Sequence, residues 1–131
     1  MPHQAGWIEL YSAIEEGKEF SKELVELCKS SRTKIVGETM LHWYSIEGEP
    51  DVLQKLIDLG FEINTQNKFG HTPIMESSLI KRWDNVMVLL ENGADLTIEN
   101  NYGDDYFAYL KEFGIQLPQH LVDWIELNYL S

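Results

Sequence analysis

The stretch that decides the fold reads GHTPIM over residues 70–75 and LLENGADLT over residues 89–97. Each half has a counterpart earlier in the chain, GETMLH over residues 37–42 and LIDLGFEIN over residues 56–64. Self-similarity at a fixed period of this size is typical of solenoids, in which each unit packs against its neighbours. The repeat glycines, which stand 33 residues apart, are Gly37, Gly70 and Gly103.

Each unit carries the local signals of two short helices. Thr39 and Thr72 stand where a helix needs an N-cap, since a hydroxyl there accepts a hydrogen bond from an unpaired backbone N–H. Pro73 follows at the first helical position, where a missing N–H costs nothing. Gly60 and Gly93 follow apolar runs, and we expect both to adopt the left-handed conformation that ends a helix. The sequence therefore predicts an all-α chain of paired helices joined by hairpin-like loops.

These motifs resemble the ankyrin repeat, a family whose units open their first helix with a Thr-Pro-Leu-His signature. Residues 39–42 match the signature with Met40 in place of the proline, and residues 72–75 match it with Met75 in place of the histidine. The quoted ending of the second helix also resembles the family closely. The resemblance is strong over residues 37–102 and degenerate on both sides. It implies an all-α ankyrin-repeat solenoid of about four helix–turn–helix units with atypical terminal units.

The weaker flanks are also assigned to helical pairs. Residues 10–17 align with residues 41–48 at an offset of 31, which indicates an N-terminal unit with a shortened loop. We therefore expect one domain over residues 1–131. Its predicted parts are a degenerate N-terminal repeat (4–36), two repeats (37–69 and 70–102) and a C-terminal capping repeat (103–131).

The charge is strongly acidic and unevenly spread. The chain holds 22 acidic and 10 basic side chains, and its net charge is −12. Residues 83–131 carry nine acids and one base, a net −8, against −4 for residues 1–82. This excludes a nucleic-acid binder, which needs a basic footprint. This uneven charge would attract a basic protein partner and guide it to the C-terminal half. Solubility of the C-terminal cap is an equal alternative explanation.

The sequence gives no sign of a membrane or an export signal. No apolar run approaches the length of about 20 residues that spans a bilayer. Residues 1–6 lack the basic and apolar segments of a signal peptide. We expect a cytoplasmic protein that is monomeric when free and has no membrane partner.

No motif for catalysis is present. There is no histidine pair at metal-ligand spacing, no phosphate loop and no nucleophile elbow. Cys28 is the only cysteine and is expected to be buried, and His42 is interpreted as a buried side chain that ties a loop to a helix. Asp104 and Asp105, with Glu99 nearby, would be the one candidate cation site, but we interpret Asp105 as a helix cap and Asp104 as a solvated loop residue. We expect no enzyme, no metal and no cofactor.

The ankyrin resemblance implies protein binding through the loop tips and the concave face of the first helices. Phe69 and Tyr102 are the best candidates, because each is an aromatic residue at a loop tip directly before a repeat glycine. Packing of both rings against neighbouring loops is an even alternative. The predicted partner-binding residues are Glu38, Glu47, Lys68, Phe69, His71, Glu76, Asn101, Tyr102, Asp104 and Asp105.

Two functions stay open from the sequence. One is an immunity protein that neutralises a cognate toxin by occluding its active cleft, with an acidic surface that mimics the polyanion bound by a nuclease. The other is a general ankyrin adaptor or scaffold that holds proteins together without inhibiting them. The sequence supports both through the same architecture and charge.

Overall fold

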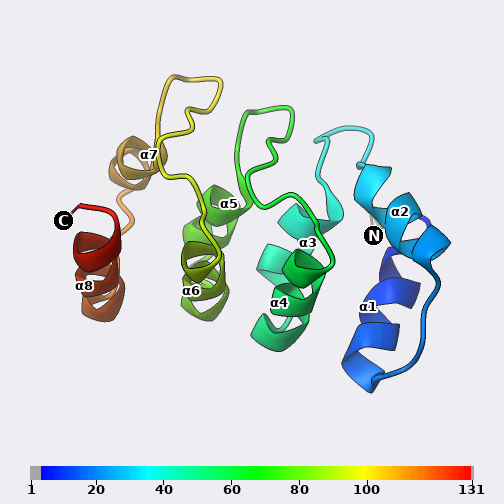
Figure 1. Ribbon diagram of the computed structural model, residues 1–131. Coiled ribbons are helices and arrows are strands. Elements are labelled where there is room, and N and C mark those ends of the chain that lie inside the picture. The colour runs from blue at the N-terminus through cyan, green and yellow to red at the C-terminus, as the bar shows by residue number, and fades with distance from the viewer. Residues whose placement is uncertain (1–3, 131) are drawn as a thin grey trace.

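A computed structural model describes residues 4–130, and these residues form eight helices in four consecutive pairs (Figure 1). The fold class is confirmed as an all-α solenoid. The predictions for residues 1–3, including His3, and for Ser131 lie outside the described residues. The helices are α1 (Trp7–Glu16), α2 (Lys22–Ser30), α3 (Met40–Glu47), α4 (Pro50–Asp58), α5 (Pro73–Leu79), α6 (Trp83–Glu91), α7 (Tyr106–Glu112) and α8 (Gln119–Asn128).

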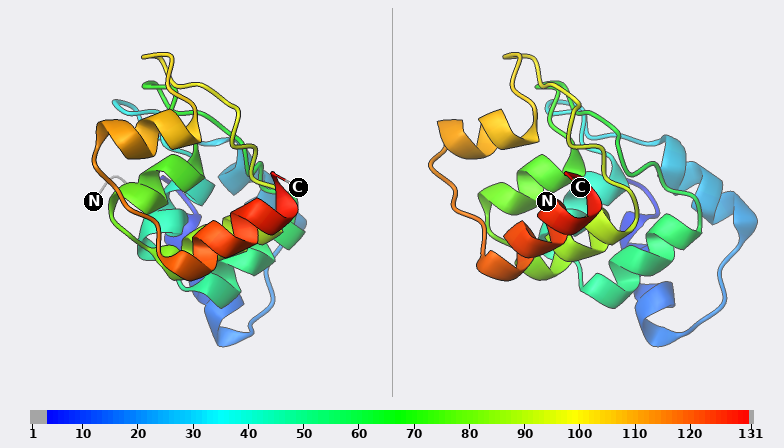
Figure 2. Two further views of the ribbon diagram at one scale, coloured as in Figure 1. Left: turned by 90° about the vertical axis from the view of Figure 1, so that its left-hand side faces the viewer. Right: turned by 60° about the vertical axis from the view of Figure 1, so that its left-hand side comes forward.

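Three loops project from the same side of the helical stack, at the top of Figure 1. The loops over residues 59–72 and 92–105 each contain fourteen residues, whereas the first, over residues 31–39, contains nine. The first helices α3, α5 and α7 pack against one another in series, and α4 packs on α6. Seen from the C-terminal end, α5 and α7 lie on one side of the stack and α8 on the other, with the loops above them (Figure 2).

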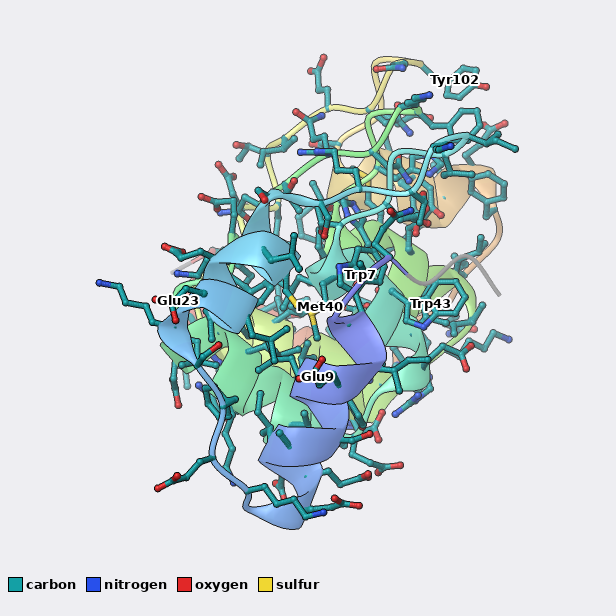
Figure 3. The ribbon with its side chains drawn as sticks, turned by 90° about the vertical axis from the view of Figure 1, so that its right-hand side faces the viewer. Trp7, Glu9, Glu23, Met40, Trp43 and Tyr102 are labelled. Atoms are coloured by element: carbon teal, nitrogen blue, oxygen red, sulfur yellow. The ribbon has the colours of Figure 1, made fainter. Side chains whose placement is uncertain are left out.

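One apolar core runs the length of the stack. The inner faces of α4 and α6 are buried in it, and four further apolar side chains of these helices are partly buried. The buried residues are Val52, Leu53, Leu56, Val86, Leu89 and Leu90, and the partly buried ones are Ile57, Trp83, Met87 and Val88. Burial of each such side chain contributes about 1.5–3 kcal/mol. Figure 3 shows Trp7 and Met40 between the helices, and Glu23 at the outer surface. The largest fully buried side chains include Trp7, Leu10, Leu53, Leu56, Leu89, Leu90, Tyr106, Tyr109 and Leu121.

The predicted helix caps form at two positions and fail at a third. Thr39 Oγ1 accepts a hydrogen bond from the His42 backbone N–H at 3.3 Å, and Asp105 Oδ1 accepts one from the Ala108 N–H at 2.9 Å. Thr72 occupies the N-cap position of α5, but its hydroxyl makes no capping bond and has no partner among the described residues. The expectation for the Thr72 hydroxyl was therefore wrong. In α3 the His42 side chain bonds back to the cap and completes a capping box, whereas α5 has a methionine in that place.

His42 links two units, as predicted for a buried histidine. Its ring is fully buried, and Nδ1 accepts from the Thr39 backbone N–H at 3.2 Å. That bond assigns the proton to Nε2, which donates to the His71 carbonyl of the next loop at 2.8 Å. Burial lowers the pKa of His42, so the ring is neutral in this position.

Two side chains at the start of α6 fix the end of α3. Arg82 donates to the carbonyls of Ile46 and Gly48, and Asn85 Nδ2 donates to those of Ser45 and Gly48, both at 3.0 Å. The last carbonyls of a helix have no intrahelical partner, so these bonds satisfy them and join neighbouring units. Within residues 4–130, no helix is long and apolar enough to cross a membrane.

Candidate protein-binding surface

Each of the two long loops is built around a buried asparagine. Asn67 Oδ1 accepts hydrogen bonds from the Phe69 N–H at 2.9 Å and the His71 N–H at 3.0 Å. Asn100, one period later, accepts from the N–H groups two and four residues ahead at 2.9 and 3.0 Å. The sequence reasoning missed both residues. The signal that could have found them is an asparagine three positions before a repeat glycine in both units.

The loop tips are bonded to one another. The Lys68 N–H donates to the Val36 carbonyl at 2.8 Å, and the Asn101 N–H donates to the Phe69 carbonyl at 3.0 Å. The side chains repeat the pattern, since Asn101 Nδ2 donates to the Lys68 carbonyl at 2.6 Å and Lys68 Nζ donates to the Lys34 carbonyl. Lys68 and Asn101, which were predicted to meet a partner, thus hold the three tips in register.

A groove lies between the two long loop tips and the C-terminal end of α7, and we call it the aromatic groove. It has a volume of about 580 Å³. Three of its side chains are exposed aromatics: Tyr102 is 75% exposed, Phe113 is 53% exposed and Phe69 is 45% exposed. Figure 3 shows Tyr102 at the margin of the loop layer. The lining residues are Phe69, His71, Asn100, Tyr102, Asp104, Glu112 and Phe113.

Four residues predicted from the sequence meet in this groove: Phe69, His71, Tyr102 and Asp104. Glu112 and Phe113 were missed. They stand at the end of α7, beyond the loop-tip positions to which the resemblance pointed, and no repeat of their pattern marks them. Of the remaining predicted residues, Glu47 is exposed at the end of α3, and Asp105 caps α7.

Two further predicted residues, Glu38 and Glu76, form a largely buried cluster beneath the loops. Their side chains are only 15% and 14% exposed. Asn67 Nδ2 donates to Glu76 Oε2 at 2.7 Å and lies 3.4 Å from Glu38 Oε2. His71 Nδ1 is 3.6 Å from Glu76 Oε2, and His42 Nδ1 is 3.8 Å from Glu38 Oε2. We call these five side chains the Glu38–Glu76 cluster, and His71 joins it to the aromatic groove.

The pKa values of the two carboxyls of the cluster are shifted in opposite directions. Burial, together with the neighbouring Glu76 carboxylate, raises the pKa of Glu38 to about 8. Burial also acts to raise the pKa of Glu76, but hydrogen bonds from His71 and from Glu38 outweigh it, so this pKa is lowered. These opposite shifts favour a state near neutral pH in which the two carboxyls together carry one proton and one negative charge.

The candidate cation site and the lone cysteine can both be placed in residues 4–130. No group of three or more histidine, cysteine or acidic side chains is placed to hold a metal ion in this part of the chain. Cys28 is fully buried, as expected, and burial raises the pKa of its thiol to about 11, which makes it a poor nucleophile. The chemistry that the surface can offer is aromatic and acidic contact.

Comparisons with known proteins agree with this architecture. A family model of ankyrin repeats, in three copies, matches residues 4–104. The chain is 32% identical over 69 residues to the human transient receptor potential cation channel subfamily A member 1, covering 53% of this chain and 6% of the channel. It is 31% identical over 84 residues to an ankyrin repeat protein of variola virus, covering 61% of this chain and 15% of the viral protein. It is 36% identical over 77 residues to the Tonsoku-like protein of Bos taurus, covering 59% of this chain and 6% of that protein. The chain thus spans only a small part of each of these relatives.

Proposed function

The chain belongs to the ankyrin-repeat family, whose repeats indicate a protein-interaction module, and we propose that it binds a basic protein partner without catalysing a reaction. The partner lies on the loop tips and the concave face, across the units at residues 37–69, 70–102 and 103–131. The single observation that carries this proposal is the aromatic groove, in which three exposed aromatic rings stand beside two carboxylates. Exposed aromatics with a charged rim are typical of protein interfaces.

The charge distribution supports a basic partner. Residues 83–131 carry nine acidic side chains and one basic side chain, Lys111, and this part of the chain supplies five of the seven groove residues. A surface of one sign attracts a partner of the opposite sign and raises the rate of encounter. The predicted partner residues fall into two roles. Phe69, His71, Tyr102, Asp104 and Glu47 meet the partner, whereas Glu38, Lys68, Glu76, Asn101 and Asp105 hold the surface in shape.

We further propose that the partner is a toxin and that binding neutralises it. An acidic surface on a small, rigid scaffold imitates the polyanion that a nuclease toxin would bind, so it can occlude a basic active cleft. The support is the net charge of −12 and its concentration beside the loop tips. The alternative is an adaptor that binds without inhibition, and it predicts the same complex with an uninhibited partner.

The test is to co-express the chain with a toxin domain encoded beside its gene and to measure both complex formation and growth. A complex with restored growth supports the immunity function. A complex without restored growth supports the adaptor, and no complex with this or any other basic protein contradicts the proposal.

A surface variant then tests the binding face. Tyr102→Ala, Asp104→Lys and Glu112→Lys are combined, and Asp105 is left intact because it caps α7. Affinity for the partner should fall at least tenfold, since truncation at an interface centre typically costs about 2 kcal/mol or more. The matched control combines Ile8→Ala, Glu91→Lys and Glu126→Lys, which changes the charge equally on exposed residues outside the groove. Equal loss in both variants would show that the effect is only net charge.

A further inference from the structure

We propose that the aromatic groove is a receptor for one arginine side chain of the protein partner. This inference rests on the proposed function, because it assigns the group that a basic protein would insert. The groove's volume of about 580 Å³ lies within the range of pockets that hold small ligands, about 300–1,000 Å³.

The walls of the groove suit a flat cation. Phe69 and Tyr102 project from successive loop tips, and Phe113 stands at the end of α7. All three residues keep about half or more of their surface exposed, although Phe113 also packs on Tyr109 with ring centroids 4.9 Å apart, so each retains surface for a ligand. A guanidinium group is attracted to aromatic faces and stacks on them. Arginine does this better than lysine, because its charge is planar and weakly hydrated.

The acidic residues of the groove give the cation its counter-charge. Asp104 and Glu112 line the groove, and no lysine or arginine is among the described residues that line it. Two bases, Lys68 and Lys111, are next in sequence to groove residues, but neither lines the groove, and the Lys68 ammonium donates to the Lys34 carbonyl. Carboxylates pair with guanidinium in a fixed, often bidentate geometry, which adds specificity to the charge attraction. The last carbonyls of α7 carry a partial negative charge, which also favours a cation at this end of the helix.

The groove is held in shape before any partner arrives. Asn67 fixes the backbone N–H groups of Phe69 and His71, and Asn100 does the same for Tyr102 and Asp104. Asn101 ties the two tips together through the Phe69 carbonyl at 3.0 Å. A preformed site loses less conformational freedom when it binds, so more of the contact energy appears as affinity.

The experiment is an NMR titration of the whole chain with N-acetyl-arginine amide, N-acetyl-lysine amide and N-acetyl-citrulline amide. Citrulline has the shape of arginine without its charge, so it isolates the electrostatic part. We expect shifts confined to the groove residues and binding of arginine at least threefold tighter than lysine and at least tenfold tighter than citrulline. Tyr102→Ala and Asp104→Asn should each weaken arginine binding at least threefold, and Glu91→Gln, an exposed acid outside the groove, should leave it unchanged.

The outcomes separate this inference from the proposed function. Equal binding of arginine and citrulline, or shifts located elsewhere, overturns the arginine receptor. So does a protein partner whose affinity is unaffected by Tyr102→Ala and Asp104→Asn, although the protein-binding function would then still stand. Conversely, arginine binding to the groove in a chain that binds no basic protein would leave the site intact as a receptor for a free guanidinium compound. That result would overturn the protein source of the ligand.

Discussion

Two buried tyrosines on α7 should respond in opposite ways to the loss of one oxygen atom. Tyr106 and Tyr109 are 1% and 0% exposed, so their burial is matched. The Tyr106 hydroxyl lies 2.7 Å from Ser78 Oγ, which has no other hydrogen-bond partner within residues 4–130. The Tyr109 hydroxyl is buried without a hydrogen-bond partner among the described residues. We therefore expect Tyr106→Phe to destabilise the protein and Tyr109→Phe to leave it equally stable or more stable.

The magnitudes follow from the fate of each polar group. Tyr106→Phe leaves the Ser78 hydroxyl buried and unpaired, which costs about 1–3 kcal/mol. Tyr109→Phe removes a hydroxyl that is already unpaired, so up to about 1 kcal/mol is recovered. The two variants should thus differ by about 1–4 kcal/mol although each loses the same atom from the same helix. Ionisation does not contribute near neutral pH, because burial raises the pKa of Tyr106 to about 12 and that of Tyr109 further still.

Urea unfolding followed by circular dichroism measures the difference. With a slope of about 2 kcal/mol per molar, the midpoints of the two variants should lie about 0.5–2 M apart. A loss of 1 kcal/mol or more in Tyr109→Phe would refute the reasoning, because it would mean that the hydroxyl has a partner in solution. Equal slopes in both variants serve as the control that the unfolded surface is unchanged.

Four further perturbations test the fold. Glu38→Gln should remove a pH dependence: the folded pKa of about 8 lies above the ordinary 4.5, so the wild-type loses stability as pH rises from 4.5 through 8. Allowing for screening by water, the free energy of unfolding of the variant should exceed that of the wild-type by about 1–2 kcal/mol at pH 8 and by little at pH 4.5. Urea unfolding at both pH values measures this difference. The pH dependence of Glu76 has the opposite sign, because a lowered pKa stabilises the folded protein at pH values above the ordinary pKa of 4.5. Glu76→Gln should therefore lower the free energy of unfolding at pH 7. Gly70→Ala places a Cβ 2.6 Å from the backbone of the next loop and should lower the melting temperature more than Gly93→Ala, where the position is open and φ is also positive. Arg82→Ala should lower the free energy of unfolding by about 2–3 kcal/mol, measured by chemical unfolding. The reason is that two carbonyls at the end of α3 lose a charged hydrogen-bond donor.

The repeat architecture was predictable because its signals are local. The period, the caps and the turn glycines each lie within a few residues of the element they specify, so one unit can be interpreted from its own sequence and checked against the next. The Thr72 hydroxyl is a feature that these local signals do not predict. The position was predicted correctly, but whether a hydroxyl reaches an N–H depends on side-chain geometry that the pattern does not contain.

The candidate site was predictable only in part, because it combines loop-tip residues that recur with the repeat and residues at the end of α7 that do not. The loop-tip residues Phe69 and Tyr102 follow from the repeat, but Glu112 and Phe113 reach the groove through the course of the chain after α7 begins. The burial of Glu38 and Glu76 was also missed. Carboxylates are almost always solvated, and only the approach of two successive units, with Asn67 between them, makes their burial possible.

The bonds between loop tips have a consequence for engineering the chain. Arg32 donates to the Gln66 carbonyl at 2.9 Å, and Gln66 donates to the Glu99 carbonyl at 3.0 Å, so each loop carries a donor that reaches the corresponding position of the next. An inserted copy of residues 37–69 would carry its own Gln66 and so keep each of these donors opposite a carbonyl, whereas an insertion of half that length would interrupt the row. The molecule is therefore expected to tolerate growth in whole modules, each of which widens the binding surface without redesign of the others.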